Sequence, residues 1–232
     1  GNFGNVFAGY CARRMGLPIE KLIVGSNSND ILTRFFEKGV MEADGVVPTL
    51  SPSMDILISS NLERLLYESA DRDGRLVKSW MELLKDCGSF SIGAQRLSEL
   101  QKTFAAGFAD DQMTADEIRR VYEHAGYLMD PHTAVASHVL AEYRENTGDH
   151  TTAVIIATAS PYKFAADVLA ALLGPALAEG LSPFDCADRL HAHTGVPIPR
   201  QITELKTLPV RHTAVCDKGD MEAALLAQLG QA

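Results

Sequence analysis

The sequence is short of cysteine, of positive charge and of long apolar runs. Four cysteines occur in 232 residues and none forms a Cys-x-x-C pair, a pattern that favours reduced cytoplasmic thiols over a zinc site or a disulfide framework. Lysine and arginine total 21 against 30 acidic residues, which gives a net charge of −9. This balance disfavours a surface for nucleic acid or acidic membranes, because both require clustered positive charge. No apolar run approaches the length of a membrane span, and we expect a cytoplasmic protein.

Several catalytic signatures are missing as well. The sequence contains neither a G-x-S-x-G nucleophile elbow nor a P-loop lysine motif, which removes two common motif-based assignments. His191 and His193 are two residues apart, so on a helix they point to different sides, and we predict no metal site. The chain also lacks an initiator methionine, and we expect it to be part of a longer protein.

What is present is the composition and patterning of an α/β chain. Hydrophobic residues make up 46% and charged residues 22% of the sequence, values that suit one large core or two small ones. A helical segment at residues 6–15, a buried strand at 21–25 and a helix from residue 31 alternate, and a strand at 152–158 precedes a helix at 162–173. We therefore predict an open, twisted, mostly parallel sheet flanked by helices.

Helices dominate the predicted middle and tail. Residues 60–130 are expected to form a helix-rich insertion, in which Thr114-Ala115-Asp116-Glu117 has the spacing of a capping box that opens a helix. Residues 87–113 predict neither helix nor strand clearly. We assign residues 1–175 to one portion of a ligand-binding domain and residues 176–232 to a helical tail that packs on the same domain.

The most informative segment is the first, Gly1-Asn2-Phe3-Gly4-Asn5. Glycine allows backbone conformations that a side chain would forbid, and lets main-chain N–H groups approach a ligand closely. The helix that follows adds unpaired N–H groups and the positive end of its dipole. Such a turn binds anions, and phosphate above all. The alternative is an ordinary glycine turn that only opens a helix.

Further candidate residues follow predicted strands or lie in polar turns. Ligands bind beyond the carboxyl ends of strands in open α/β sheets, which selects Thr158 and the Asn27-Ser28-Asn29-Asp30 loop. The alternatives are a threonine that closes a strand, and Asx turns with a helix cap. Ser51 and Ser53 lie in a Ser-Pro-Ser turn that could bind a ligand or serve as a turn alone. His132 follows Asp130-Pro131 at a helix start, where a structural role is commoner than that of a base.

Taken together, these segments resemble the threonine synthase family, pyridoxal-phosphate enzymes of fold type II related to tryptophan synthase β. The resemblance covers about residues 1–175, and the tail is consistent with it. The segments that carry it stand in family order: residues 1–5 with the continuation Phe7-Ala8-Gly9-Tyr10, residues 26–30, Thr49-Leu50-Ser51-Pro52-Ser53-Met54-Asp55-Ile56, Asp130-Pro131-His132-Thr133-Ala134-Val135-Ala136, and Thr158-Ala159-Ser160-Pro161-Tyr162-Lys163-Phe164. The third and fourth strings are the most distinctive.

The resemblance implies a cofactor and a reaction. The family holds the 5′-phosphate of pyridoxal 5′-phosphate in a loop that matches Gly1, Asn2, Phe3, Gly4 and Asn5, and places a hydroxyl at the position of Thr158 against the pyridine nitrogen. It implies conversion of O-phospho-L-homoserine and water to L-threonine and phosphate, by γ-elimination and β-addition of water. The residues that bind the substrate are not fixed by the resemblance, and the candidates are Asn27, Asn29, Ser51 and Ser53.

The resemblance also implies that a catalytic residue lies elsewhere. The Schiff-base lysine of the family precedes the phosphate loop, and none of the eight lysines of this chain stands in its motif. Lys163 matches a position on the helix after the strand and is interpreted as a solvated charge. Ser160 replaces the usual histidine of the family. We therefore expect this chain alone to be inactive and to be the carboxyl-terminal part of an enzyme.

Three functions remain open at this stage. The first is part of a threonine synthase, the second is another fold type II lyase such as a serine or threonine dehydratase, and the third is a non-catalytic phosphate-binding module derived from the family. The string Ser51-Pro52-Ser53-Met54-Asp55-Ile56 argues against the second. The sequence does not determine whether the protein is a monomer or a homodimer.

Overall fold

The computed structural model describes residues 2–43, 45–211 and 213–230. The chain divides into two compact units, Gly1–Ile198 and Pro199–Ala232. The described part of the second unit is formed by α10 (Arg200–Leu205), the short 3-10 helix η4 (Lys218–Asp220) and α11 (Met221–Gln228). This division reflects compactness alone, so the division at residue 175 that the sequence suggested stays a prediction.

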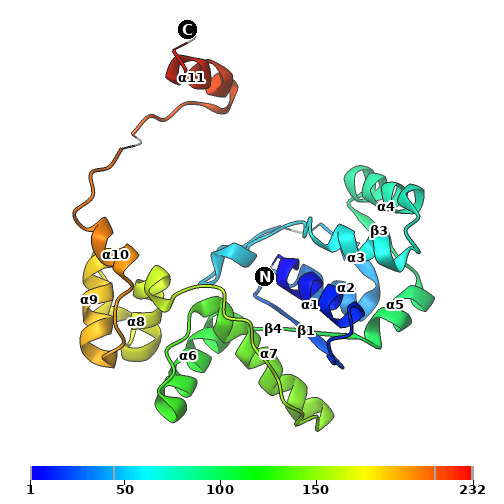
Figure 1. Ribbon diagram of the computed structural model, residues 1–232, viewed down its shortest axis with the longest axis horizontal. Coiled ribbons are helices and arrows are strands. Elements are labelled where there is room, and N and C mark those ends of the chain that lie inside the picture. The colour runs from blue at the N-terminus through cyan, green and yellow to red at the C-terminus, as the bar shows by residue number, and fades with distance from the viewer. Residues whose placement is uncertain (1, 44, 212, 231–232) are drawn as a thin grey trace. The chain divides into compact units, whose positions relative to one another are not determined.

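The first unit carries the strands and most of the helices in the described chain (Figure 1). Its elements are α1 (Gly4–Arg14), β1 (Leu22–Ser26), α2 (Ile31–Lys38), β2 (Val40–Glu42), η1 (Pro52–Met54), α3 (Leu62–Ser69), α4 (Gly74–Cys87), β3 (Ser89–Ser91), α5 (Ala94–Gln101), β4 (Phe104–Phe108), α6 (Asp111–Ala125), α7 (Pro131–Thr147), η2 (Pro161–Phe164), α8 (Ala165–Leu173), η3 (Pro175–Leu177) and α9 (Pro183–Thr194). The helices expected near residues 6–15, 31–36 and 162–173 are thus confirmed.

A parallel pair of strands lies at the centre of this unit. Strand β1 pairs with β4 from Leu22 opposite Phe104 to Ser26 opposite Phe108. Side chains alternate between the two faces of a strand. One face of β1 meets α1 and α2, through Leu22 against Gly9 and Ser26 against Thr33, and the other face meets α7. The arrangement of helices on both faces of a parallel pair confirms the α/β class (Figure 1).

Glycine allows α7 to approach these strands closely. A Cβ atom at Gly25 would lie 3.3 Å from the Cα of Ala136, and one at Gly107 would lie 2.9 Å from Cγ1 of Val139. Real Cβ contacts are rarely this short, so both strands need glycine where the helix crosses them. The amino-terminal end of α7 is thereby held against the sheet.

A second, antiparallel pair lies beside the first. Strands β2 and β3 pair from Val40 opposite Ser91 to Glu42 opposite Ser89, and Trp80 of α4 stacks on Phe90 with ring centroids 5.9 Å apart. The described strands therefore form two separate pairs, because no hydrogen-bonded pairing joins β2 or β3 to β1 or β4.

The prediction of a strand at residues 152–158 is wrong for the described structure. These residues follow α7 without pairing to a neighbouring strand, and Val154 and Ile156 are 80% and 60% exposed. Valine and isoleucine favour extended backbone, but a strand forms only where another chain segment offers N–H and C=O partners. The segment has the composition of a buried strand and no partner among the described residues.

The predicted capping box at Thr114 is also wrong. Helix α6 begins one turn earlier, where the Asp110 carboxylate accepts a hydrogen bond from the Met113 N–H at 2.8 Å. Thr114 and Glu117 lie inside the helix and are buried. The Glu117 carboxylate is bound by the Arg120 guanidinium at 2.7 Å and by the Ser137 hydroxyl of α7. Glu117 therefore joins α6 to α7, and the Thr-x-x-Glu spacing does not open a helix.

Candidate functional site

The candidate anion site is the turn from Asn2 to Asn5 at the start of α1. Phe3 occupies the left-handed region with φ 60° and ψ −5°, a conformation that opposes the preference of a non-glycine residue by about 1–2 kcal/mol. Its side chain is 1% exposed and packs against Phe36 and Phe104, with centroids 5.9 and 6.1 Å away. Burial of this ring fixes the turn, since it offsets the cost of the backbone conformation.

The residues of the turn line a cavity at the start of α1, where backbone N–H groups lack an intrahelical acceptor. The first bond of α1 runs from the Phe7 N–H to the Phe3 carbonyl at 2.9 Å, and helix geometry leaves the N–H groups before Phe7 without an intrahelical acceptor. A cavity of about 240 Å³ lies against them, lined by Asn2, Phe3, Gly4, Asn5, Val6 and Asn61. A Cβ atom at Gly4 would lie 3.8 Å from Nδ2 of Asn61, so a side chain there would project toward that amide. The cavity therefore suits a small anion such as a phosphate.

The start of α3 holds this turn from the opposite side. Nδ2 of Asn61 donates a hydrogen bond to the carbonyl of Asn2 at 2.7 Å, and the Ser59 hydroxyl donates to the Oδ1 of Asn2 at 3.2 Å. Sequence reasoning missed both residues. Asn61 stands at the N-cap position of α3 and makes no side-chain cap, which is apparent only when the distant turn is placed beside it.

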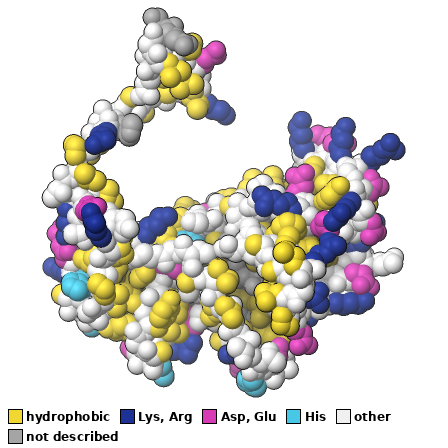
Figure 2. All heavy atoms as spheres, viewed as in Figure 1, with side chains coloured by type: hydrophobic (Ala, Val, Ile, Leu, Met, Phe, Trp, Pro, Cys, Tyr) yellow, Lys and Arg dark blue, Asp and Glu magenta, His cyan; other side chains and the backbone are white. Residues whose placement is uncertain are grey.

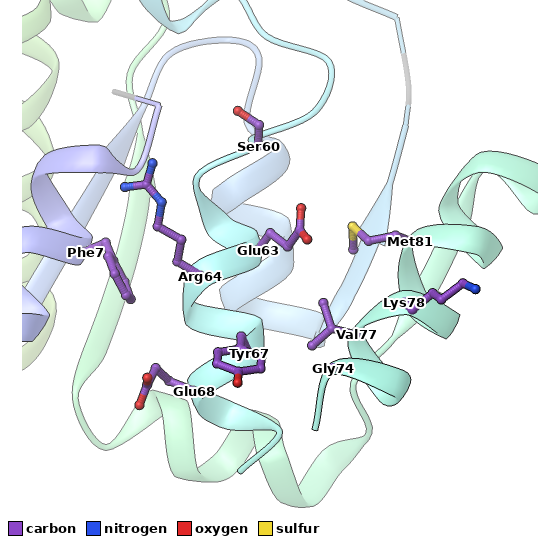
Figure 3. Close-up of a pocket in the computed structure, with 10 residues that line it drawn as sticks. All are labelled: Phe7, Ser60, Glu63, Arg64, Tyr67, Glu68, Gly74, Val77, Lys78 and Met81. Carbon is purple, nitrogen blue, oxygen red and sulfur yellow. The ribbon is translucent and has the colours of Figure 1, made fainter. Parts of the chain in front are cut away.

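A larger cavity lies between α1, α3 and α4 and is a weaker candidate. It encloses about 700 Å³, and its ten lining residues mix apolar side chains with both signs of charge (Figure 3). One of these, Glu68, is already paired with Arg14 and Arg72. Positive and negative side chains are likewise interspersed over α4 (Figure 2). The side chains that line the larger cavity carry both signs of charge and favour no single ligand charge, whereas the smaller cavity lies at a helix start that leaves backbone N–H groups unbonded.

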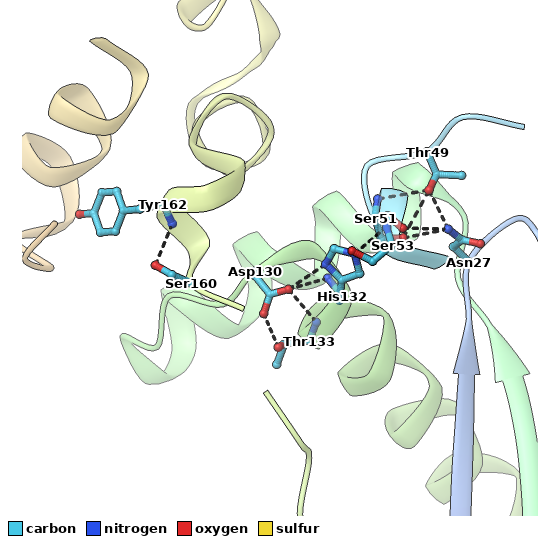
Figure 4. A network of polar contacts seen from close by, with 9 residues as sticks. All are labelled: Asn27, Thr49, Ser51, Ser53, Asp130, His132, Thr133, Ser160 and Tyr162. Carbon is cyan, nitrogen blue, oxygen red and sulfur yellow. Dashed lines mark hydrogen bonds and ion pairs between the residues drawn. The ribbon is translucent and has the colours of Figure 1, made fainter. Parts of the chain in front are cut away.

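The second polar cluster surrounds Asp55 and brings three of the predicted substrate residues together. Oδ1 of Asp55 accepts hydrogen bonds from the Asn27 amide at 2.8 Å, the Asn29 amide at 2.9 Å and the Thr49 hydroxyl at 2.7 Å. Nδ2 of Asn27 also lies 3.0 Å from the Ser51 hydroxyl. Asn27 and Ser51 are each 1% exposed. Because these groups bond one another, the cluster fixes the loop after β1 to the turn before η1 (Figure 4).

His132 connects this region to the start of α7. Its Nδ1 hydrogen-bonds Oδ1 of Asp130 at 3.1 Å, and its Nε2 accepts from the backbone N–H of Ser53 at 3.2 Å (Figure 4). A carboxylate accepts and an N–H donates, so these partners require the proton on Nδ1. The ring also packs on Phe164, with centroids 4.9 Å apart. The lone pair that a general base would use is engaged, which favours the structural interpretation of this histidine.

Asp130 is the buried anchor of that contact. It is 1% exposed and accepts hydrogen bonds from the backbone N–H groups of His132 and Thr133, from Nδ1 of His132 and from the Thr133 hydroxyl. Burial alone would raise the pKa of this carboxyl, but the hydrogen bonds from His132 and Thr133 more than offset burial, and the pKa lies below its ordinary value. The carboxylate therefore caps α7 in its charged form.

The remaining predicted residues lie apart from these clusters. Thr158 is exposed in the unpaired segment and makes no hydrogen bond among the described residues, and Gly1 lies outside the described residues. Ser53 is exposed and joins the network through its backbone. The Ser160 hydroxyl caps η2 at the Tyr162 N–H, 3.3 Å away. Lys163 is exposed over the ring of Phe164. The assignment of cofactor and substrate ligands stays a prediction.

Metal ligands and membrane spans are not found in the described chain. No group of three or more His, Cys, Asp or Glu residues with metal-binding geometry occurs among residues 2–43, 45–211 and 213–230. His191 bonds the Val196 carbonyl at 2.7 Å and His193 packs on Tyr122. Within the same residues, no helix combines the length and the apolar character needed to cross a bilayer.

Comparison with known sequences points to one family. A sequence model described as "Threonine synthase, C-terminal" matches residues 133–224. The threonine synthase of Pseudomonas aeruginosa is 38% identical over 212 residues, covering 91% of this chain and 44% of that protein. The enzyme of Saccharomyces cerevisiae is 40% identical over 189 residues, covering 75% of this chain and 37% of that protein. The chain thus spans less than half the length of these relatives.

Comparison with solved structures agrees. A pyridoxal-phosphate-bound threonine synthase from Brucella melitensis is 40% identical and superposes with a TM-score of 0.70, covering 84% of this chain and 45% of that one. The yeast threonine synthase is 34% identical with a TM-score of 0.80, covering 100% of this chain and 46% of that one. The fold expected from the sequence is therefore confirmed.

Proposed function

Because this chain belongs to the threonine synthase family and matches its carboxyl-terminal part, we propose that it forms part of a threonine synthase. The proposed enzyme converts O-phospho-L-homoserine and water to L-threonine and phosphate with bound pyridoxal 5′-phosphate. The single observation that carries this proposal is the turn at Asn2–Asn5, whose cavity suits a phosphate and whose sequence matches the cofactor loop of the family.

The chain's own residues support a binding role. The first residues of α1 line the cavity, and their backbone N–H groups would hold the 5′-phosphate of the cofactor. We assign Thr158 to the pyridine nitrogen, where a neutral hydroxyl leaves that nitrogen largely unprotonated. The bound cofactor would supply an electron sink for the elimination of the γ-phosphate.

Substrate contacts are proposed at the Asp55 cluster. Asn27, Asn29 and Ser51 lie together there, and Ser53 adjoins them through η1. Because the amides of Asn27 and Asn29 already donate within the cluster, we propose that Asn27, Asn29 and Ser51 shape the loops around the substrate. The exposed Ser53 hydroxyl makes the direct contact.

The free cysteines of the described chain, with no disulfide among them, support a cytoplasmic location.

The proposal places the cofactor-bonding lysine outside this chain. None of the eight lysines stands in the family's lysine motif, so the chain alone would bind the cofactor through its phosphate and would not release phosphate from the substrate. The test is the gene sequence immediately upstream of Gly1, followed by an assay of the protein it encodes. Phosphate and threonine released from O-phospho-L-homoserine support the proposal. Deamination of serine or threonine instead would assign the chain to a dehydratase, and cofactor binding without either reaction would make it a binding module.

A further inference from the structure

The start of α3 is fixed to the anion-binding turn by two contacts that helix formation does not require. The Asn61 amide donates to the Asn2 carbonyl and the Ser59 hydroxyl donates to the Asn2 side chain, at 2.7 and 3.2 Å. The helix makes no use of Asn61 as a side-chain cap. The Asn61 side chain therefore stabilises the turn at Asn2 rather than the start of its own helix.

The position of Asn61 is set by the packing of α3 in the core. The first turns of α3 are anchored in the core by Leu62, Leu65 and Leu66, each at most 1% exposed. Ser59, just before the helix, is 4% exposed. Because these side chains hold the helix start in place, the Asn61 amide stays at a fixed distance from the turn.

Asn61 also has an N–H group left for a ligand. A side-chain amide carries two N–H donors, and among the described residues Nδ2 of Asn61 donates to one acceptor, the Asn2 carbonyl. The amide lines the cavity with Asn2–Val6 and lies against the open side of Gly4, 3.8 Å from where a Cβ would stand. A second donor on this wall would complement the backbone N–H groups of α1 across the cavity.

We propose that Asn61 is a phosphate-binding residue that also positions the turn. One N–H holds the Asn2 carbonyl, so that the backbone N–H groups face the cavity, and the other donates to an oxygen of the ligand's phosphate. Ser59 is a positioning residue, which acts only through the Asn2 side chain. This inference rests on the proposed cofactor site. It adds to that site a ligand from the start of α3, 59 residues after Asn2 in the chain.

The test measures the contribution of the phosphate alone. Pyridoxine 5′-phosphate and pyridoxine share the ring and lack the aldehyde that would react with the chain's lysines, so the ratio of their dissociation constants isolates the phosphate. The ratio is measured by titration calorimetry for the wild-type chain, Asn61→Ala, Asn61→Asp and Ser59→Ala. Asn146→Ala and Asn146→Asp, at an exposed position of α7, are the matched controls.

Wild-type chain and both Asn146 variants are expected to prefer the phosphate ester. Asn61→Ala should reduce that preference about tenfold or more, because a hydrogen bond to a charged group is lost. Asn61→Asp should reduce it further, since a carboxylate repels the phosphate and cannot donate. Ser59→Ala should give a smaller loss. Thermal unfolding of each variant identifies any that fail to fold, and the Asn61 variant that does fold then carries the test.

The outcomes separate the inference from the proposal on which it rests. A wild-type preference that survives in Asn61→Ala overturns the role of Asn61 and leaves the phosphate site standing. A wild-type chain that binds both ligands equally overturns the phosphate site, and the inference with it. Equal losses in Asn61→Asp and Asn146→Asp would assign the effect to charge at a distance and also overturn the inference.

Discussion

Nε2 of His132 accepts a hydrogen bond from the backbone N–H of Ser53, 79 residues earlier in the chain. Together with Asp130, which bonds Nδ1 of the same ring, this contact joins the amino-terminal end of α7 to the turn at η1. The two motifs that were most distinctive in the sequence are therefore parts of one structural unit. Their shared task is to place the polar loops at one edge of the parallel strands.

Replacement of His132 by alanine should weaken this unit. The variant leaves the Ser53 N–H without its acceptor and removes one donor from the buried Asp130 carboxylate, so we expect the free energy of unfolding to fall by about 2 kcal/mol. Urea denaturation followed by circular dichroism measures the change. His150→Ala, at an exposed position, is the control and should unfold like the wild type. Equal stability of the two variants would show that the contact contributes nothing.

The stability of the chain should depend on Asp130 in acid. Its pKa is lowered in the folded state, against about 3.9 for an unfolded aspartate. The group therefore stabilises the fold above the unfolded value, and this contribution is lost as the pH falls through the lower folded value. Asp130→Asn should be less stable near neutrality and should lose part of the decline in stability below about pH 4. Urea midpoints across that range test this, with the exposed Glu123→Gln as control.

Local signals predicted the helices well. Asp130 with Pro131 marked the start of α7, because a cap acts within one turn of the chain. Strand β4 was missed, since Phe104–Phe108 holds no β-branched residue, and its identity comes from pairing with β1. The opposite error occurred at residues 152–158. Their composition predicted a strand, but no partner strand pairs with them among the described residues.

In the candidate site, too, local features were predictable from the sequence and contacts between distant residues were not. The candidate anion-binding turn was proposed from Gly4 and its asparagines, because these residues are adjacent in the sequence, and its role in binding stays a prediction. Asn61 and Asp55 were missed, because their importance arises from contacts with groups 59 and 28 residues away. Asp55 accepts hydrogen bonds from the Asn27 and Asn29 side chains and from the hydroxyl and backbone N–H of Thr49, and the sequence alone does not reveal these contacts.

Replacement of Asp55 by asparagine should disrupt the loop cluster. Oδ1 accepts from Asn27, Asn29 and the Thr49 hydroxyl, and Oδ2 accepts from the Thr49 backbone N–H. An amide has only one acceptor oxygen, so its NH₂ group must face at least one of these donors. We expect a loss of about 1–3 kcal/mol in the free energy of unfolding. Denaturation in urea measures it, and Asp86→Asn on the exposed face of α4 should change it little. A variant as stable as this control would mean that the cluster is not a structural anchor.

Gly107→Ala should separate α7 from the parallel strands. The new methyl group would lie 2.9 Å from Cγ1 of Val139, a distance that forces the helix or the strand to move. Overpacking of this kind reduces stability by about 1–3 kcal/mol. Gly45→Ala meets no atom within 4 Å and serves as the control. If both alanine variants melt at the wild-type temperature, the close approach of α7 is wrong.

Gly4→Val should weaken phosphate binding, and should reduce stability no more than the same change at the start of another helix. The side chain would project toward Asn61 and fill the cavity that the N–H groups face, so affinity for pyridoxine 5′-phosphate should fall at least tenfold, the loss expected for one hydrogen bond to a charged group. The control is Gly74→Val, because Gly74 is likewise the first residue of a helix and a Cβ there meets nothing within 4 Å. Both variants should lose similar stability from the β-branched side chain, and only Gly4→Val should lose the ligand. Equal affinities in the two variants would mean that the turn at Gly4 does no more than begin a helix.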